Sequence, residues 1–134
     1  MKGKLGYWIA IGVFSLMMAA SGIGYVLRIT PMVNTFHHLG YPDYFLTLLG
    51  VAKLLGVVAL LAPRAPVVVR EWAYAGFGIT CVAAAISHGA SGDSVVRVAV
   101  PLVALALLGT VRRLSSTHGA YREPFAALRP AANH

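Results

Sequence analysis

Lys53 lies at the centre of the most hydrophobic stretch of the chain, residues 44–62, with nine residues on either side. A stretch of this length can cross a membrane as a helix, which places the ammonium near the middle of the hydrocarbon core. A cation at that depth costs roughly 2.5–3.5 kcal/mol on insertion scales, so such residues usually serve a function. Lys53 is therefore the first candidate for a ligand or partner site. The alternative is a structural lysine whose long side chain extends to the outer interface and meets a carbonyl group or Asp43.

Four more polar side chains lie at depths that are compatible with a shared site. With antiparallel spans and the N-terminus inside, two fall in the outer half of the first span and two near the outer end of the third. This asymmetry predicts a pocket that opens toward the periplasm or the outer leaflet. A structural role and a role as proton donor or ligand are equally open for the histidine among them. The candidate ligand-binding residues are Lys53, His88, Ser21, Tyr25 and Ser87.

Several kinds of chemistry are excluded by what the sequence lacks. Cys81 is the single cysteine, so the chain can form no internal disulfide and no CxxC redox pair. We expect Cys81 to be a small packing residue. His37 and His38 are adjacent, and adjacent helical positions point about 100° apart, so they cannot face one metal ion. No metal-ligand set, haem motif, phosphate loop or nucleophile triad is present. We therefore expect no metal and no haem, and the sequence identifies no catalytic residue.

The composition places the chain among membrane proteins. Hydrophobic residues make up 58% of the 134 residues and charged residues only 11%, against about 25% charged residues in soluble domains. Four segments are long enough to span a bilayer, and we expect an all-α membrane protein built as a four-helix antiparallel bundle. The predicted spans are residues 6–27, 44–62, 71–90 and 94–111.

The positions of lysine and arginine predict the orientation. Eight of these residues fall on one side of the predicted spans, and only Arg28 and Arg97 fall on the other. The positive-inside rule then puts both termini and the 63–70 loop of this multi-pass membrane protein in the cytoplasm. The net charge of +7 is thus a topology signal, and we expect a lipid bilayer rather than nucleic acid as the partner.

The connecting segments carry local signals. Thr30 as N-cap, Pro31 at the first position and Gly40 as the stop predict a short interfacial helix over residues 31–39. Pro101 predicts a kink or local unwinding in the fourth span, with Arg97 reaching out to Asp93 or to headgroups. Residues 1–111 form the predicted transmembrane domain, and residues 112–134 form a polar cytoplasmic tail.

Pairs of small residues four positions apart predict where helices approach closely. We expect them to pack the monomer rather than to form a dimer seam. These pairs are Ala20/Gly24, Ala52/Gly56 and Gly76/Thr80.

Several short motifs occur in order along the chain. They are Ser21-Gly22-Ile23, Gly40-Tyr41-Pro42, residues 49–56 around Lys53, residues 70–76 (Arg-Glu-Trp-Ala-Tyr-Ala-Gly), and Ser87-His88 before Gly92-Asp93. In this order the chain resembles the DoxX-like family of small four-helix bacterial membrane proteins, which implies a multi-pass protein of a bacterial inner membrane. DoxX and DoxD relatives usually carry a glutamate where this chain has Lys53.

The resemblance implies a link to redox chemistry, because the DoxD branch is associated with a thiosulfate:quinone oxidoreductase and other DoxX proteins with membrane-bound redox assemblies. Two hypotheses follow. The chain is a redox-associated subunit whose outer pocket holds a quinone or another small amphiphile, with Lys53 on an oxygen and His88 relaying a proton. Alternatively, it is a non-catalytic accessory subunit that packs against other membrane subunits or a second copy of itself.

Overall fold

The computed structural model describes residues 2–117, which fold into helices joined by short turns. Within this range, every helix except the second is long and apolar enough to cross a membrane. The predicted all-α architecture with four membrane-spanning helices is confirmed. The helices are α1 (Lys2–Val26), α2 (Thr30–His38), α3 (Asp43–Leu61), α4 (Val67–Ala90) and α5 (Val95–Thr117).

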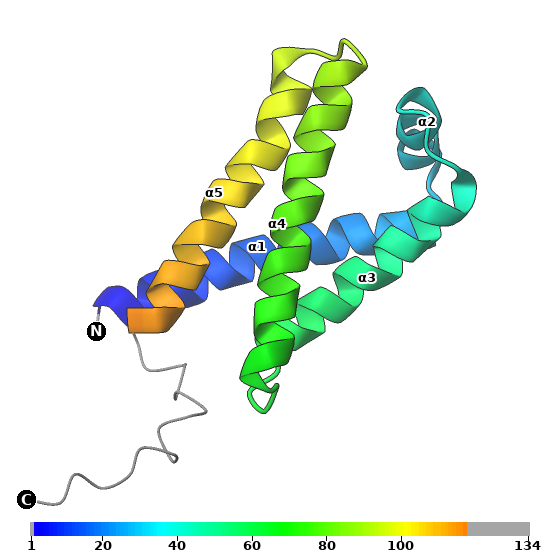
Figure 1. The fold of residues 1–134 in the computed structure, drawn as a ribbon. Helices are drawn as coiled ribbons and strands as arrows, with labels where there is room; N and C mark the ends of the chain where they lie inside the picture. The colour runs from blue at the N-terminus through cyan, green and yellow to red at the C-terminus, as the bar shows by residue number, and fades with distance from the viewer. Residues whose placement is uncertain (1, 118–134) are drawn as a thin grey trace, which may run out of the picture.

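The four long helices form two antiparallel pairs, α1 with α3 and α4 with α5 (Figure 1). Figure 1 shows the green and yellow α4–α5 pair crossing the blue and cyan α1–α3 pair at a steep angle. α1 also packs against α5, and α3 against α4, so the helices close into a ring. The short helix α2 lies at the end of the bundle where α1 ends and α3 begins.

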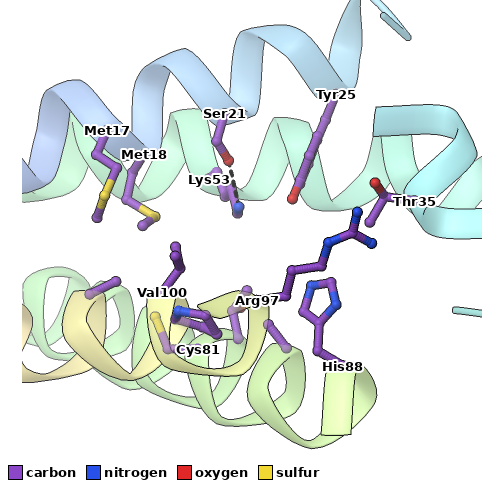
Figure 2. Close-up of a pocket in the computed structure, with 14 residues that line it drawn as sticks. Met17, Met18, Ser21, Tyr25, Thr35, Lys53, Cys81, His88, Arg97 and Val100 are labelled. Carbon is purple, nitrogen blue, oxygen red and sulfur yellow. Dashed lines mark hydrogen bonds between the residues drawn. The ribbon is translucent and has the colours of Figure 1, made fainter. Parts of the chain in front are cut away.

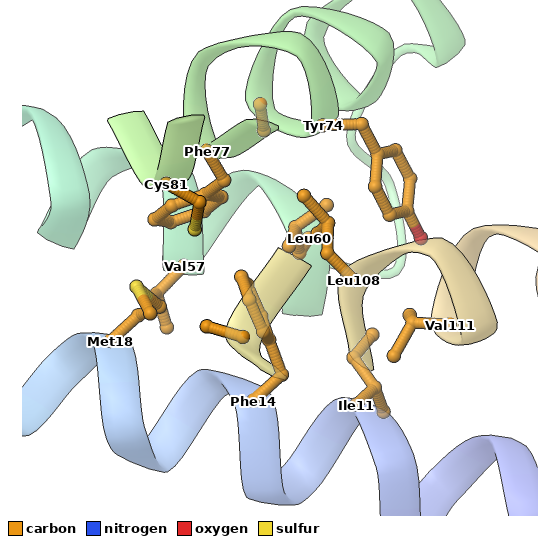
Figure 3. Packing of buried hydrophobic residues seen from close by; sticks show 12 residues of the cluster. Ile11, Phe14, Met18, Val57, Leu60, Tyr74, Phe77, Cys81, Leu108 and Val111 are labelled. Atoms are coloured by element: carbon orange, nitrogen blue, oxygen red, sulfur yellow. The ribbon is translucent and has the colours of Figure 1, made fainter. Parts of the chain in front are cut away.

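The hydrophobic core lies toward the end of the bundle opposite α2, where the two pairs cross (Figure 3). Phe14 of α1 and Phe77 of α4 meet edge to face with ring centroids 5.2 Å apart. Arg112 of α5 joins Glu71 of α4 across the same end at 3.0 Å. The helices carry further core residues on each side of these contacts: Ile11, Val57, Leu60, Tyr74, Leu108 and Val111.

The outer surface of the helices is apolar, as a lipid-facing surface requires. Leu16 of α1 is 73% exposed, Ile79 of α4 is 71% exposed and Val95 of α5 is 83% exposed. A chain in water would bury side chains of this kind. The hydrophobic surface therefore supports a bilayer environment for all four long helices.

A glycine ends α2 and lets the next residue hydrogen-bond back to the last turn of that helix. Gly40 has a φ of +81°, which side chains disfavour, and the N–H of Tyr41 donates to the carbonyl of Phe36 at 2.9 Å. The rings of Phe36 and Tyr41 then pack with centroids 5.7 Å apart. The predicted stop at Gly40 is thus confirmed, but the predicted N-cap is not. Ile29 is the N-cap of α2, and Thr30 lies within the helix.

The helices extend beyond the predicted spans. α4 begins at Val67, and α5 continues to Thr117, so residues 112–117 of the predicted tail are helical. Hydropathy locates the part of a helix that lies in hydrocarbon, whereas charged residues such as Arg112 continue a helix readily outside it. The rest of the predicted tail, residues 118–134, lies outside the described residues. α5 also runs through Pro101 without interruption, so no local unwinding occurs there.

Candidate functional site

The ammonium of Lys53 lies inside the bundle, between the core and α2. The residue is only 8% exposed. Its Nζ donates to the hydroxyl oxygen of Ser21 at 2.6 Å and lies 4.4 Å from the ring centroid of Tyr25. Ser21 and Tyr25 are four residues apart, so both lie on the face of α1 that packs against α3. A hydroxyl oxygen and an aromatic face therefore surround the cation on this side.

Lys53 has fewer partners than a buried ammonium requires. An ammonium has three N–H donors, and Ser21 is the one hydrogen-bond acceptor that residues 2–117 supply. None of the ion pairs within this range includes Lys53. Asp43, the carboxylate that the structural alternative would use, is instead bound by Arg28 at 2.8 Å and by His37. The cation–π contact with Tyr25 contributes about 2 kcal/mol or more when it is desolvated, but it accepts no conventional hydrogen bond from the ammonium.

A cavity of about 420 Å³ opens beside Lys53, where the two helix pairs diverge (Figure 2). Figure 2 shows Ser21, Tyr25 and Lys53 on one wall, with Cys81, His88 and Arg97 facing them. We call this the main cavity. Its lining comes from all five helices: Met17, Met18, Ser21, Tyr25, Thr35, Lys53, Thr80, Cys81, Ala84, His88, Arg97, Val100, Pro101 and Ala104.

Two further recesses reach Lys53 from other directions. One, the α2 recess, is about 200 Å³ and lies between α2, α3 and α4, with Phe36, Tyr41 and Ser87 in its lining. The other, the α3–α4 groove, is about 330 Å³ and is lined by Ala52 and Gly76, among others. Lys53 lines all three spaces. The ammonium thus lies where the openings of the bundle meet.

The carboxylate of Asp93, just after the end of α4, binds basic side chains on the side of the main cavity that faces Lys53. The oxygens of Asp93 accept from Nδ1 of His88 at 2.6 Å, Nε2 of His38 at 3.0 Å and Nη1 of Arg97 at 3.2 Å. The hydrogen bond from His88 is the largest cause that lowers the pKa of Asp93 below its ordinary value. The bond to His38 also ties α2 to the α4–α5 turn. The predicted contact between Arg97 and Asp93 is confirmed.

A backbone turn at Gly92 places Asp93 next to His88. α4 ends at Ala90, Gly92 follows with a φ of +69°, and the N–H of Asp93 donates to the carbonyl of His88 at 3.0 Å. This closure brings the Asp93 side chain next to the imidazole. Since Nδ1 of His88 bonds to a carboxylate, Nε2 is the ring nitrogen left for a ligand; it has no partner within residues 2–117.

The structure brings most of the five predicted residues together. Lys53, Ser21, Tyr25 and His88 line the main cavity. Ser87 does not; it lines the α2 recess, where its hydroxyl bonds to the hydroxyl of Tyr41 at 2.7 Å. Ser87 therefore anchors the α2 end rather than facing the space beside Ser21.

Sequence reasoning missed some residues of the site. Arg97 was expected at the outer interface, and it does pair with Asp93, but it also lines the main cavity. Thr80 lines all three spaces, although its spacing with Gly76 suggested a packing residue. Thr35 of α2 lines two of them. A helical-wheel comparison of Thr80 with Cys81, Ala84 and His88 could have found the first of these positions.

Four apolar helices around a buried cation and a half-open cavity define a multi-pass membrane protein with an internal recess. A family model described as the DoxX-like family matches residues 9–111. The chain belongs to this family, and the resemblance seen in its motifs is confirmed. No curated protein and no solved structure gives a significant match.

Proposed function

We propose that this protein is a redox-associated membrane subunit whose main cavity binds a quinone or another small amphiphile. One observation carries the proposal: a buried lysine that finds a single hydrogen-bond acceptor within residues 2–117 lies beside a cavity of about 420 Å³. Ligand pockets span roughly 300–1,000 Å³, and a few polar groups in a mostly apolar lining give them specificity. A carbonyl or anionic oxygen on the ligand would accept the hydrogen bonds that Ser21 leaves unmade.

The residues around the main cavity would have distinct roles in ligand binding and proton transfer. Lys53 holds the ligand oxygen, while Ser21 and the Tyr25 ring hold the ammonium in place. His88 presents Nε2, and the carboxylate of Asp93 on Nδ1 stabilises the imidazolium that forms when Nε2 takes a proton. A quinone, when bound, supplies the redox chemistry. The redox part of the proposal rests on the association of DoxX relatives with membrane-bound redox assemblies.

Binding of decylubiquinone to purified protein in nanodiscs tests the proposal. We expect saturable binding at one site per chain and a Kd that rises about tenfold or more in Lys53→Met, since a charge-assisted hydrogen bond is lost. Lys4→Met is the matched control, because Lys4 is an exposed lysine near the other end of α1. Equal binding by the wild type and Lys53→Met would refute the proposed role of Lys53.

A second candidate function is a non-catalytic accessory subunit, and the α3–α4 groove favours it. A Cβ built on Gly76 would meet no atom within 4 Å, so the groove has room for a side chain from a neighbouring helix. Lys53 lines this groove and could pair there with an acidic residue of a partner. If gentle extraction brings other subunits down with the wild type but not with Lys53→Met, while neither binds decylubiquinone, this function holds instead.

A further inference from the structure

The main cavity is lined by basic side chains and, within residues 2–117, by no acidic one. Lys53, His88 and Arg97 face it from α3, α4 and α5, and none of the described lining residues is an aspartate or a glutamate. The linings of the α2 recess and the α3–α4 groove contain none either. All three spaces that meet at Lys53 thus combine apolar walls with basic groups.

The acidic residues that the structure describes bind other basic side chains: Asp93 and Asp43 at the α2 end, and Glu71, which pairs with Arg112, at the other end. Asp93 accepts hydrogen bonds from His88, His38 and Arg97, and its side chain is only 8% exposed. Asp43 is bound by Arg28 at 2.8 Å. Neither carboxylate lines the main cavity. The charge of Lys53 therefore has no counter-ion within the described part of the chain, and a buried charge without one is costly.

Arg97 adds a second cation at the mouth of the cavity. Its contact with Asp93 uses Nη1 at 3.2 Å, and its side chain is 59% exposed. The other guanidinium nitrogens have no partner within residues 2–117. Figure 2 shows the Arg97 side chain reaching from α5 across the cavity toward Thr35. A guanidinium that keeps free donors can bind a carboxylate or a phosphate.

Besides the mouth at Arg97, the flanks of the cavity open toward the lipid-facing surface. Met17 of α1 and Val100 of α5 line it, and they are 36% and 58% exposed. On the other side, Leu55 and Trp72 of the α3–α4 groove are 66% and 72% exposed. A molecule that enters between α1 and α5 would therefore keep its chain in hydrocarbon while its head reaches Lys53.

We infer that the ligand of this cavity is a single-chain amphiphile with an anionic head group, which sits between Lys53 and Arg97. This inference rests on the proposed function and names the charge class of its ligand. The chain leaves the cavity between α1 and α5, along Met17 and Val100. The anionic head supplies the counter-ion that Lys53 lacks, and the apolar chain makes entry from the bilayer favourable. A carboxylate and a phosphate monoester share this chemistry.

Four 18-carbon probes with matched chains test the inference by competition with radiolabelled oleate on protein in zwitterionic nanodiscs. The probes are unlabelled oleate, oleoyl lysophosphatidate, methyl oleate and oleylamine. We expect one oleate per chain, and we expect methyl oleate and oleylamine to compete at least tenfold more weakly than oleate. The ratio of oleate to lysophosphatidate identifies whether a carboxylate or a phosphate is preferred.

Variants localise the binding. Lys53→Met should lose about tenfold or more in oleate affinity and Arg97→Gln should lose less, whereas Lys4→Met and Arg64→Gln, which remove exposed cations elsewhere, should match the wild type. Should Lys53→Met fail to fold, Ser21→Ala, which only removes the hydroxyl beside Lys53, must still weaken binding.

Two results separate this inference from the proposed function. If decylubiquinone binds and methyl oleate competes as well as oleate, the anionic ligand is wrong while the amphiphile site stands. If neither oleate nor decylubiquinone binds, both fail. Oleate binding that is unchanged in Lys53→Met and Arg97→Gln would also overturn the inference.

Discussion

At the scale of single residues, the balance of charge around two groups decides what the α2 end of the bundle can do. Lys53 is buried with a hydroxyl and a ring face as its partners. The side chain of Asp93 is only 8% exposed and has three basic side chains around it. Within residues 2–117, the ammonium of Lys53 has fewer hydrogen-bond acceptors than it has N–H donors, whereas the carboxylate of Asp93 accepts from three basic side chains. The first is therefore suited to binding a ligand, and the second to holding α2, α4 and α5 together.

The saturated carboxylate predicts a dependence of stability on pH. The pKa of Asp93 is lowered in the folded protein, chiefly by the hydrogen bond from His88. A lowered pKa means that Asp93 stabilises the fold at pH values above its unfolded pKa of about 3.9. This stabilisation falls as the pH drops through the lower, folded value. We therefore expect the melting temperature of the wild type to decrease between about pH 5 and pH 3.

Asp93→Asn isolates this effect, because its amide cannot ionise. Thermal melts followed by circular dichroism should show a lower melting temperature than the wild type at pH 7 and a smaller difference at pH 3. Asp43→Asn serves as a comparison, since Asp43 lies at the start of α3 with a 57% exposed side chain. A gap between wild type and Asp93→Asn that stays constant over this range would contradict the assigned role.

At the scale of elements, the approach of α1 to α3 positions the Lys53 partners. A Cβ built on Gly50 would lie 2.9 Å from the carbonyl oxygen of Gly22 and 2.9 Å from the Cβ of Tyr25. The two helices can therefore be this close only while position 50 lacks a side chain. This contact holds Tyr25 against the ammonium of Lys53 one turn of α3 away.

Gly50→Ala should lower stability by about 1–3 kcal/mol, because backbone rather than a flexible side chain must move. It should also weaken ligand binding, since Tyr25 would shift. Gly76→Ala is the matched control: its Cβ would meet no atom within 4 Å, so we expect it to be neutral or to stabilise the helix by about 0.5–1 kcal/mol. Chemical denaturation of both variants in detergent measures the difference, and a Gly50→Ala protein as stable as Gly76→Ala would contradict it.

Helix positions could be predicted from the sequence, but the contacts between them could not. Long apolar segments identified the four spans, and the glycine after His38 and Leu39 identified the end of α2. The pairs of small residues were less informative. Gly56 does face Phe77 of α4, but a Cβ on Gly76 would meet no atom within 4 Å, and the Gly22–Gly50 approach was missed. Spacing shows where close packing is allowed, whereas rotation of each helix decides where it occurs.

The same limit applies to the site. Depth along the helices placed Ser21, Tyr25 and His88 near Lys53, because residues at equal depth in a small bundle cannot be far apart. Depth does not specify how each helix is rotated about its own axis. The pairing of Ser87 with Tyr41 and the position of Arg97 in the main cavity were therefore not predicted.

At the scale of the whole molecule, charge is segregated between the two ends of the bundle. Arg28 and Arg97 lie at the α2 end, and Arg64, Arg70 and Arg112 lie at the other end. The positive-inside rule predicts that the α2 end faces the periplasm. The main cavity would then open in the outer half of the membrane.

Reporter fusions test this orientation. A fusion at Asn34 in α2 or at Ser91 after α4 should read as periplasmic, and one at Ala65 between α3 and α4 should read as cytoplasmic. A cytoplasmic signal from Asn34 would reverse the predicted topology.

If Lys53 holds a ligand, the protein should keep a small molecule beside this residue when it leaves its own membrane. Native mass spectrometry of gently extracted wild type and Lys53→Met, side by side, makes this measurement. We expect a bound small molecule on the wild type, one per chain, that is absent from Lys53→Met while both variants give the same circular dichroism spectrum. Identical native spectra for the two proteins, with or without a bound molecule, would contradict it.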